Sequence, residues 1–344
     1  MAVIGAGLVG KTHAKLVAAH GDCELVGICD VDPARRAVAQ ELGVPFYTEV
    51  EELLVREEPH GAIVSTPNDD HASVVEICGL RSVHVLIEKP IAGTMEDSSR
   101  IIRTTGETGI KALVGHHRRH SPYVREVRSI VKDGALGKLV GVSMLWALLK
   151  PADYFDVEWR RRRPSGGPAL INLIHELDTL RFVCGEIRQV YAQASSGARN
   201  LEVEDSLSIS ILFESGVIGS ILGSDATPGP WSYEAAVHEN PMYFPTEENC
   251  YFFLGTLGSL AFPRMEIWRY ADIQRSGWQH PMEQSRIVVE RSDPLVSQLE
   301  HFCRVIRGEE SPLIDGRDGA KSLEAVLAVL ESIERGAPVF VPES

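Results

Sequence analysis

The chain has 344 residues, which is long for one domain and suits two. Its net charge of −14, from 34 Lys and Arg against 48 Asp and Glu, argues against general nucleic-acid binding, which needs a broad basic surface. The six cysteines form no C-x-x-C pair, which favours reduced core thiols over disulfides or a metal site. No window is apolar enough to span a membrane, and the start lacks the basic leader of a signal peptide, so a cytoplasmic protein is expected.

The first part of the chain alternates predicted strands and helices. Apolar runs predict strands at 1–5, 24–30, 61–66, 84–89 and 111–116, and helical spacing predicts helices at 11–20, 33–43, 71–80 and 95–108. This alternation indicates parallel strands joined by crossover helices, a doubly wound Rossmann-type sheet in an α/β domain. The first strand is short for a central strand, and natural residues upstream of Met1 would lengthen it.

The second part predicts a different kind of sheet. Ser121-Pro122 follows the last parallel strand, which places a boundary near residue 122: a dinucleotide-binding domain over 1–122 and a second domain over 123–344. After a helix to about 132, strands are expected at 138–147, 189–195, 206–214, 216–224 and 259–263. They predict a mostly antiparallel open sheet with helices on one face, an α+β domain. A last helix is expected at about 317–335, and its apolar stripe would pack back against the rest of the protein.

Parallel sheets of the first kind bind ligands beyond the carboxyl ends of their strands. The chemistry is therefore expected where the strands stop, at Gly5, Asp30, Ser65, Glu88 and His116.

The segment "GAGLVG" follows the first strand and opens the first helix. Its glycines at 5, 7 and 10 suit a tight turn, close approach of a pyrophosphate, and close packing of helix on strand. Asp30 ends the second strand, where an acid accepts hydrogen bonds from a ribose diol and repels a 2′-phosphate. NAD is therefore favoured over NADP, although Arg35 and Arg36 lie nearby in sequence. The predicted cofactor contacts of the turn are Gly5, Ala6, Gly7, Leu8, Val9 and Gly10.

The segment "VLIEKPIAG" is a buried strand that ends on Glu88, Lys89 and Pro90. A lysine beside a turn is more often a surface residue. Because this strand belongs to the same parallel sheet, its carboxyl end instead directs Lys89 toward the cofactor crevice.

The segment "SGGPALINLIHELDTLRF", residues 165–182, predicts a helix whose first turn contains Pro168. Leucine and isoleucine residues form a buried stripe, and a neighbouring face carries Asn172, His175, Asp178 and Thr179 at spacings of three and four. By itself this polar strip is equally consistent with a half-exposed helix surface.

Four motifs in order resemble the Gfo/Idh/MocA family: "GAGLVG", "STPNDDH" at 65–71, "EKP" at 88–90 and the Gly-Gly…His helix. Its members are NAD(P)-dependent dehydrogenases and reductases, chiefly of sugars and polyols, and the resemblance covers essentially the whole chain. It implies that Lys89 lies between nicotinamide and substrate, and that Glu88 either pairs with Lys89 or contacts the nicotinamide ribose. It also implies contacts with the dinucleotide from Ser65, Thr66, Pro67, Asn68 and His71.

The resemblance assigns the catalytic histidine to His175, with Asp178 placed to orient its ring. The family's aspartate, four residues earlier, is replaced here by Ile171. Asn172 reaches the same side of the helix and can bind a substrate hydroxyl, but it carries no charge. His175 is therefore expected to act as general base, while Lys89 stabilises the developing alkoxide.

Two further segments carry candidate contacts. In "GHHRRHSPY", 115–123, His116 and His120 have metal-ligand spacing but no evident carboxylate or cysteine partner, so no metal is expected; by the resemblance, Arg118 contacts the cofactor. The stretch 153–167 is either a solvated loop or a sugar-binding lid. In the second case Tyr154 or Trp159 stacks on a sugar ring, and Arg160 grips hydroxyls or a carboxylate.

These observations predict an NAD-dependent dehydrogenase that oxidises a secondary hydroxyl of a sugar, polyol or sugar derivative. Two alternatives remain open: an NAD-using glycosidase with transient oxidation, and a non-catalytic regulator that senses a dinucleotide or sugar. The resemblance also implies a homodimer or homotetramer through the sheet of the second domain.

Overall fold

The computed structural model describes residues 1–342, which form two compact units. The first unit comprises Met1–His117 and Pro294–Leu323, and the second comprises Arg118–Asp293 and the chain from Glu324 onward. The predicted division assigned everything after residue 122 to the second domain. The structure differs in two places: the boundary falls between His117 and Arg118, and residues 294–323 pack with the first unit.

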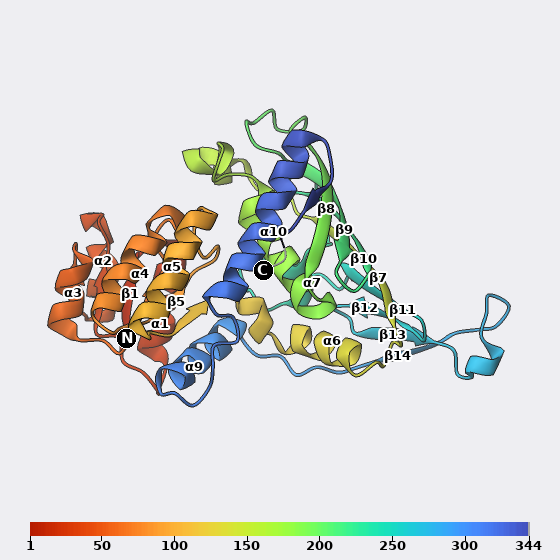
Figure 1. The fold of residues 1–344 in the computed structure, drawn as a ribbon, viewed down its shortest axis with the longest axis horizontal. Coiled ribbons are helices and arrows are strands. Elements are labelled where there is room, and N and C mark those ends of the chain that lie inside the picture. Colours follow the sequence, from red (N-terminus) through yellow and green to blue (C-terminus); the bar gives the residue numbers. More distant parts are fainter. Residues whose placement is uncertain (343–344) are drawn as a thin grey trace. The chain divides into compact units, whose positions relative to one another are not determined.

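The first unit contains a six-stranded sheet whose paired strands are all parallel. Its strands are β1 Ala2–Ile4, β2 Gly27–Cys29, β3 Phe46–Tyr47, β4 Gly61–Val64, β5 His84–Ile87 and β6 Ala112–Val114. They lie in the order β3-β2-β1-β4-β5-β6, so the direction of winding reverses between β1 and β4. This confirms the predicted doubly wound sheet (Figure 1) and places the switch point beside β1.

Helices connect these strands, as the alternating pattern predicted. They are α1 Leu8–Ala19, α2 Arg36–Leu42, α3 Val50–Glu57, α4 His71–Leu80 and α5 Met95–Thr108. Gly43 closes α2 at φ 71°, a left-handed conformation that favours glycine. Strand β3 and helix α3 were not predicted, and for β3 the reason is that a two-residue strand carries no measurable periodicity.

A segment from near the end of the chain completes the first unit. Helix α9, Pro294–Ile306, packs against α1, and Phe302 is fully buried. A Cβ at Gly61, the first residue of β4, would lie 3.2 Å from the Phe302 ring. Further along, the amide of Val114 in β6 donates to the Ile314 carbonyl at 2.9 Å. The glycine at the start of β4 therefore makes room for a helix that lies more than two hundred residues later in the chain.

The second unit contains a nine-stranded sheet in the order β14-β13-β12-β11-β7-β10-β9-β8-β15. Its strands are β7 Leu139–Ala147, β8 Ile187–Ser195, β9 Ser206–Phe213, β10 Ile218–Ser224, β11 Tyr251–Gly255, β12 Ser259–Phe262, β13 Glu266–Arg269, β14 Glu283–Arg286 and β15 Val339–Phe340. Every pairing is antiparallel except that of β7 with β10. The predicted α+β domain with a mostly antiparallel sheet is confirmed.

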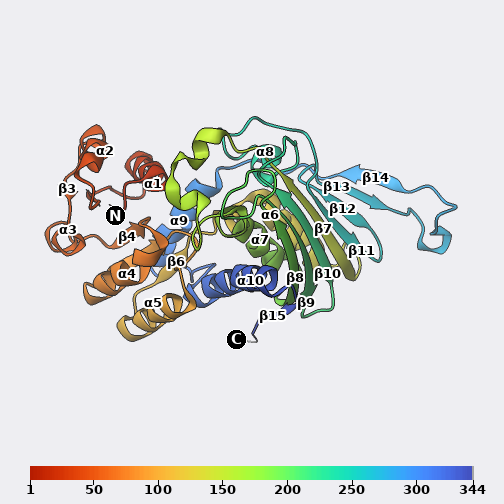
Figure 2. The ribbon, with the colours of Figure 1, turned by 90° about the horizontal axis from the view of Figure 1, so that it is seen from above.

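Helices cover one face of this sheet. Helices α6 Pro122–Lys132 and α7 Ile174–Cys184 lie on that face (Figures 1 and 2), over buried Val142, Met144 and Trp146 of β7. The predicted last helix, α10 Gly316–Arg335, packs back as expected: Ser332 accepts a hydrogen bond from the β8 amide of Ala192 at 2.9 Å. A short helix, α8 Tyr233–Val237, follows β10.

Within the described residues, no helix has both the length and the apolar character needed to cross a membrane.

Candidate active site

The carboxyl ends of the parallel strands form one row in the first unit. Each residue just past a strand bonds to the neighbouring strand, which keeps the row in register. Four backbone hydrogen bonds of 2.7–2.8 Å run from the amides of Gly5, Ser65, Glu88 and Gly115 to the carbonyls of Cys29, Ile4, Val64 and Ile87, respectively. The structure thus brings the residues singled out at the strand ends to a single edge of the sheet.

The glycines of the β1–α1 turn divide into two kinds. Gly5 has φ 89°, and a Cβ there would lie 2.5 Å from the Ser65 carbonyl oxygen. A Cβ at Gly10 would clash with the Gly5 carbonyl and lie 2.6 Å from the Ser65 hydroxyl oxygen. A Cβ at Gly7 would meet nothing within 4 Å. Gly5 and Gly10 are therefore required for packing, whereas Gly7 leaves an open approach to the backbone.

Asp30 is fixed beside this turn. One carboxylate oxygen accepts from the Ala6 amide at 2.6 Å, and the other accepts from the Asp32 amide at 2.9 Å. Each carboxylate oxygen has a second lone pair, so Asp30 retains acceptors for a ribose diol.

The groups at this edge fit a dinucleotide. Helix α1 begins at Leu8 with no side-chain cap, and Leu8 and Val9 are exposed. The first amides of the helix therefore offer hydrogen-bond donors and a partial positive charge to an approaching pyrophosphate. The open backbone at Gly7 and the acceptor at Asp30 complete the set that NAD would contact.

The segment after β4 lies along the same edge. The Ser65 hydroxyl donates to the Gly5 carbonyl at 2.8 Å, which ties the end of β4 to the glycine turn. Thr66, Pro67 and Asn68 follow, with Asn68 opening a short 3-10 helix before α4. The ring of His71 is fully buried, and its two nitrogens lie 3.1 Å from the carbonyl oxygens of Ile91 and Thr66. These contacts position the loop, and the contact of His71 with the dinucleotide stays a prediction.

Glu88 is hydrogen-bonded to a histidine that no sequence motif indicated. Its Oε1 lies 2.7 Å from Nε2 of His13 in α1, and its Oε2 accepts from the Lys89 amide at 3.1 Å. Burial alone would raise the pKa of Glu88, but the hydrogen bond and charge of His13 outweigh burial and lower the pKa to about 2. The neighbouring lysine ammonium also favours the charged carboxylate. Glu88 is thus held by α1, and Lys89 is the next residue along the row.

His175 lies in the second unit, in the second residue of α7, and is 8% exposed. The preceding turn, Ala169–Leu173, is a π-helix, a feature frequent at functional sites. Asp178, expected to orient the ring of His175, accepts two hydrogen bonds from Arg119 at 2.9 Å and 2.6 Å. Those bonds tie Asp178 to the short 3-10 helix His117–His120, which precedes α6, and thereby anchor α7.

The remaining predicted substrate contacts gather around a lysine that the sequence analysis did not single out. Asn172 accepts a hydrogen bond from Lys150 Nζ at 2.7 Å. That Nζ also lies 4.6 Å from the centre of the Tyr154 ring, and the guanidinium of Arg160 lies over the same ring at 4.2 Å. Trp159 lies 5.7 Å from the Arg160 guanidinium and is 49% exposed. Lys150 thus joins Asn172 to the predicted lid residues.

Arg118 belongs to a buried ionic cluster in the second unit. It pairs with Glu176 at 2.8 Å and Glu234 at 2.7 Å, and its guanidinium lies 3.9 Å from the Tyr233 ring centre. Burial raises the pKa of Glu176 to about 7, against the opposing charge of Arg118. Arg118 is 2% exposed and pairs with acids of this cluster, while its contact with the cofactor stays a prediction.

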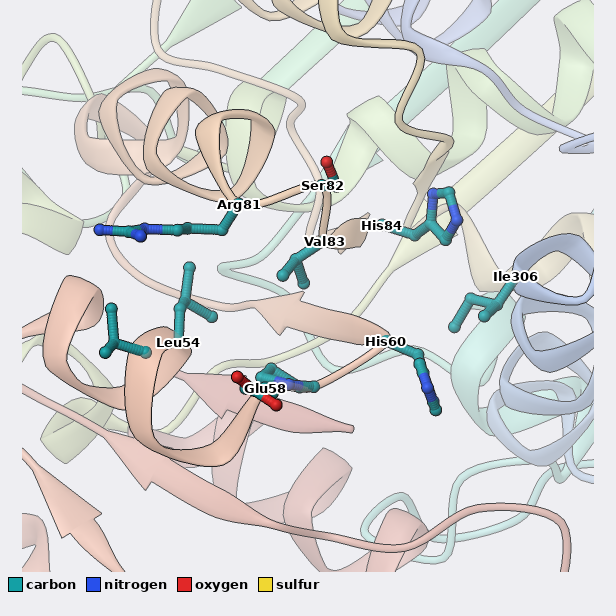
Figure 3. Close-up of a pocket in the computed structure, with 10 residues that line it drawn as sticks. Leu54, Glu58, His60, Arg81, Ser82, Val83, His84 and Ile306 are labelled. Carbon is teal, nitrogen blue, oxygen red and sulfur yellow. The ribbon is translucent and has the colours of Figure 1, made fainter.

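A hollow of about 480 Å³ lies elsewhere on the first unit (Figure 3). Its lining includes His60, just before β4, and His84, the first residue of β5, together with Arg81 and Ile306. These positions mark the amino ends of the parallel strands, whereas the dinucleotide groups lie at the carboxyl ends. The hollow is therefore separate from the candidate active site. Within residues 1–342, no group of three or more His, Cys, Asp or Glu side chains could hold a metal ion.

Two family models match the chain. The model described as "Oxidoreductase family, NAD-binding Rossmann fold" matches residues 1–116, and the "GFO/IDH/MocA C-terminal domain" matches residues 124–261. The chain belongs to the Gfo/Idh/MocA family. As a member, it is an oxidoreductase that uses NAD, and its first unit is the NAD-binding domain.

Relatives of this family member include a 1,5-anhydro-D-fructose reductase from Ensifer adhaerens, 27% identical over 91% of this chain and 90% of the relative. An inositol 2-dehydrogenase from Rhizobium meliloti (strain 1021) is 22% identical over 96% of each chain. Among solved structures, the WlbA dehydrogenase from Bordetella pertussis, in complex with NADH and UDP-GlcNAcA, superposes with a TM-score of 0.80. It is 24% identical and covers 100% of this chain and 98% of its own, which shows a shared fold.

Proposed function

We propose that the protein is an NAD-dependent dehydrogenase that oxidises a secondary hydroxyl of a sugar, polyol or sugar derivative. The observation that carries the proposal is the row of strand ends. The same edge presents the glycine turn, the ribose acceptor Asp30 and, after β5, Lys89. A lysine at this edge is placed for chemistry at the nicotinamide end of a dinucleotide.

Bound NAD supplies the acceptor for a hydride. The chain's own residues bind the substrate and handle the proton. A neutral imidazole nitrogen of His175 accepts the proton of the reacting hydroxyl, and the Lys89 ammonium stabilises the alkoxide that develops. Asn172 binds a neighbouring hydroxyl. It substitutes for the family's charged aspartate, whose position is occupied by Ile171 in this chain. Glu88, bonded to the Lys89 amide, keeps the backbone at Lys89 in position.

Replacement of Lys89 tests the proposal. With sugars, polyols and sugar acids as substrates, nicotinamide absorbance gives kcat, and titration of NAD gives its affinity. Lys89→Ala should lower kcat by about 100-fold or more, because general acid–base and electrostatic catalysis each contribute on that scale. NAD affinity should change little, since the glycine turn and Asp30 are intact.

Lys111→Ala is the matched control. Lys111 is exposed and directly precedes β6, at the opposite edge of the same sheet. It should keep wild-type turnover. Near-normal turnover of Lys89→Ala would contradict the proposal, and product formation without net NADH would favour the transient-oxidation alternative.

We also propose that the uncovered face of the nine-stranded sheet binds a second copy of the chain. Opposite the helices, the face presents exposed Ile218, Leu222, Phe252, Leu254 and Trp268. Strand register places Ile218 opposite Gly141 and Leu254 opposite the same glycine, so these side chains share one face. Exposed Ser143, Ser208, Ser210 and Ser220 lie on the same face, so apolar and small polar side chains are mixed there. Large apolar side chains exposed on an uncovered sheet are typical of a subunit interface.

A further inference from the structure

Lys150 is a buried lysine without an assigned role. The residue is 6% exposed, and it directly contacts two polar side chains. Its Nζ donates to Asn172 Oδ1 at 2.7 Å and lies 3.1 Å from Asp225 Oδ2. Lysines are rarely buried, because an ammonium loses hydration unless acceptors replace the water. Burial lowers the pKa of Lys150, and Asp225 opposes that shift. The surroundings therefore form a built polar site.

The fold brings Lys150 and Asp225 together through the one parallel pairing of the second sheet. Strands β7 and β10 end with Ala147 opposite Ser224. The pairing continues past the strands, because the Lys150 amide donates to the Asp225 carbonyl at 2.9 Å. Both residues thus lie just beyond the carboxyl ends of two adjacent parallel strands.

Cations and carboxylates are mixed at this site: buried Asp205 accepts a hydrogen bond from the Arg199 amide at 2.9 Å, and the charge of Asp225 acts on buried Glu204. Arg199 Nε lies 3.1 Å from Asp225 Oδ1, so a single carboxylate is shared by Lys150 and Arg199. Arg160 adds a third cation, over the Tyr154 ring that Lys150 also faces, and forms no ion pair with a carboxylate of residues 1–342. Glu234, the other acid acting on Lys150, pairs with Arg118 at 2.7 Å. The Arg160 guanidinium is thus the group of this cluster with which a substrate anion can pair.

We propose that Lys150, Asn172 and Arg160 bind a carboxylate on the substrate, so that the dehydrogenase acts on a sugar acid. Two of the three Lys150 N–H groups are directed to Asn172 and Asp225, and the third is directed to a substrate oxygen. The side-chain oxygen of Asn172 accepts the hydrogen bond from Lys150, which leaves the NH₂ group of Asn172 to donate to the substrate. The inference rests on the proposed dehydrogenase function and names its substrate class.

Binding is measured by calorimetry on the full chain saturated with NAD, and turnover is followed by nicotinamide absorbance. The probes are D-gluconate and D-glucuronate, with D-glucose and myo-inositol as neutral counterparts. The acids should bind more tightly than the neutral compounds. Lys150→Met should weaken acid binding by about 10- to 100-fold, as expected for loss of a charge-assisted hydrogen bond, and should affect neutral compounds much less.

Lys138→Met is the matched control, because Lys138 is exposed and precedes the amino end of the same strand, β7. It should behave as wild type. Arg160→Gln covers the case in which Lys150→Met does not fold: Arg160 is only half-buried, and its replacement should also weaken acid binding selectively. Circular dichroism and NAD affinity report whether each variant is intact.

Absence of acid binding in the wild type, or equal losses for acids and neutral compounds in the variants, would overturn the proposal. A different result would contradict the dehydrogenase function alone. Lys89→Ala would then leave turnover unchanged, while calorimetry would still show that the protein binds acids selectively and that this binding depends on Lys150.

Discussion

Glu88 illustrates how single residues in this protein depend on partners far away in the chain. Without His13, a carboxylate buried beside Lys89 would be costly, because burial disfavours the charged form. Gly115, at the end of β6, allows this arrangement, since a Cβ there would lie 3.2 Å from Glu88 Oε1. Three elements thus converge on one carboxylate, and that carboxylate bonds to the Lys89 amide.

The Glu88–His13 pair predicts a pH-dependent contribution to stability. Glu88→Gln should lower the free energy of unfolding at neutral pH by about 1.5–3 kcal/mol, the usual contribution of a hydrogen bond to a charged group. The native pKa of about 2 lies below the unfolded value of about 4.3. The contribution is therefore complete above the unfolded pKa and is lost as the pH falls through the native pKa.

Urea unfolding of wild type and variant, from about pH 7 down to about pH 3, should show the difference between them narrowing in acid. Glu52→Gln is the control, because Glu52 pairs with Arg56 at 2.9 Å on the exposed face of α3 and should contribute no more than about 0.5 kcal/mol. A difference that stays constant with pH would contradict this account of Glu88.

At the scale of elements, the β1–α1 turn combines two demands on glycine. Gly10 allows α1 to approach the ends of β1 and β4, whereas Gly7 leaves its backbone open on the outer side. Packing and ligand approach therefore rest on different residues of the same six-residue motif. Substitution of each glycine can separate the two demands.

Gly10→Ala should destabilise the fold, because its methyl group would clash with the Gly5 carbonyl and press on the Ser65 hydroxyl. Gly7→Ala should leave the unfolding free energy within about 1 kcal/mol of wild type, since φ is −67° and nothing lies within 4 Å. It should nevertheless weaken NAD binding by about tenfold or more, because the methyl group occupies the approach of the pyrophosphate. Thermal unfolding and NAD titration of both variants check the separation; wild-type NAD affinity in Gly7→Ala would refute it.

At the scale of the whole molecule, the uncovered face of the nine-stranded sheet is the largest unexplained feature of the second unit. It exposes five large apolar side chains, and a monomer rarely gathers so many on one face. Leu222 lies on β10, a central strand of the sheet, and is 58% exposed. Association of this face with that of another copy would remove it from water.

Leu222→Lys should therefore lower the molar mass in solution toward that of a single chain, measured by light scattering after size exclusion. The added charge would lie in an apolar contact. Leu80→Lys is a matched control, because Leu80 is 81% exposed at the end of α4 in the first unit. A wild-type protein that is already monomeric, or an unchanged mass in Leu222→Lys, would contradict the proposed interface.

The sequence predicted those features that depend on neighbouring residues. The six-residue glycine motif, the helix at 95–108 and the capping Gly43 are local patterns, and each is found where expected. Short elements such as β3 were missed because they contain too few residues to show a period. Three predicted ligand contacts stay predictions, and the structure adds their surroundings: His71 and Arg118 are buried, and Glu88 is hydrogen-bonded to His13.

The sequence by itself determined the fold class, the NAD-binding edge and the family, because strand–helix alternation and motif spacing are properties of consecutive residues. Only the tertiary structure decided that residues 294–323 complete the first unit, and that β7 pairs in parallel with β10 to unite Lys150 with Asp225. These features depend on contacts between residues dozens to hundreds of positions apart. No local pattern encodes such contacts, because they follow from how whole sheets and helices pack.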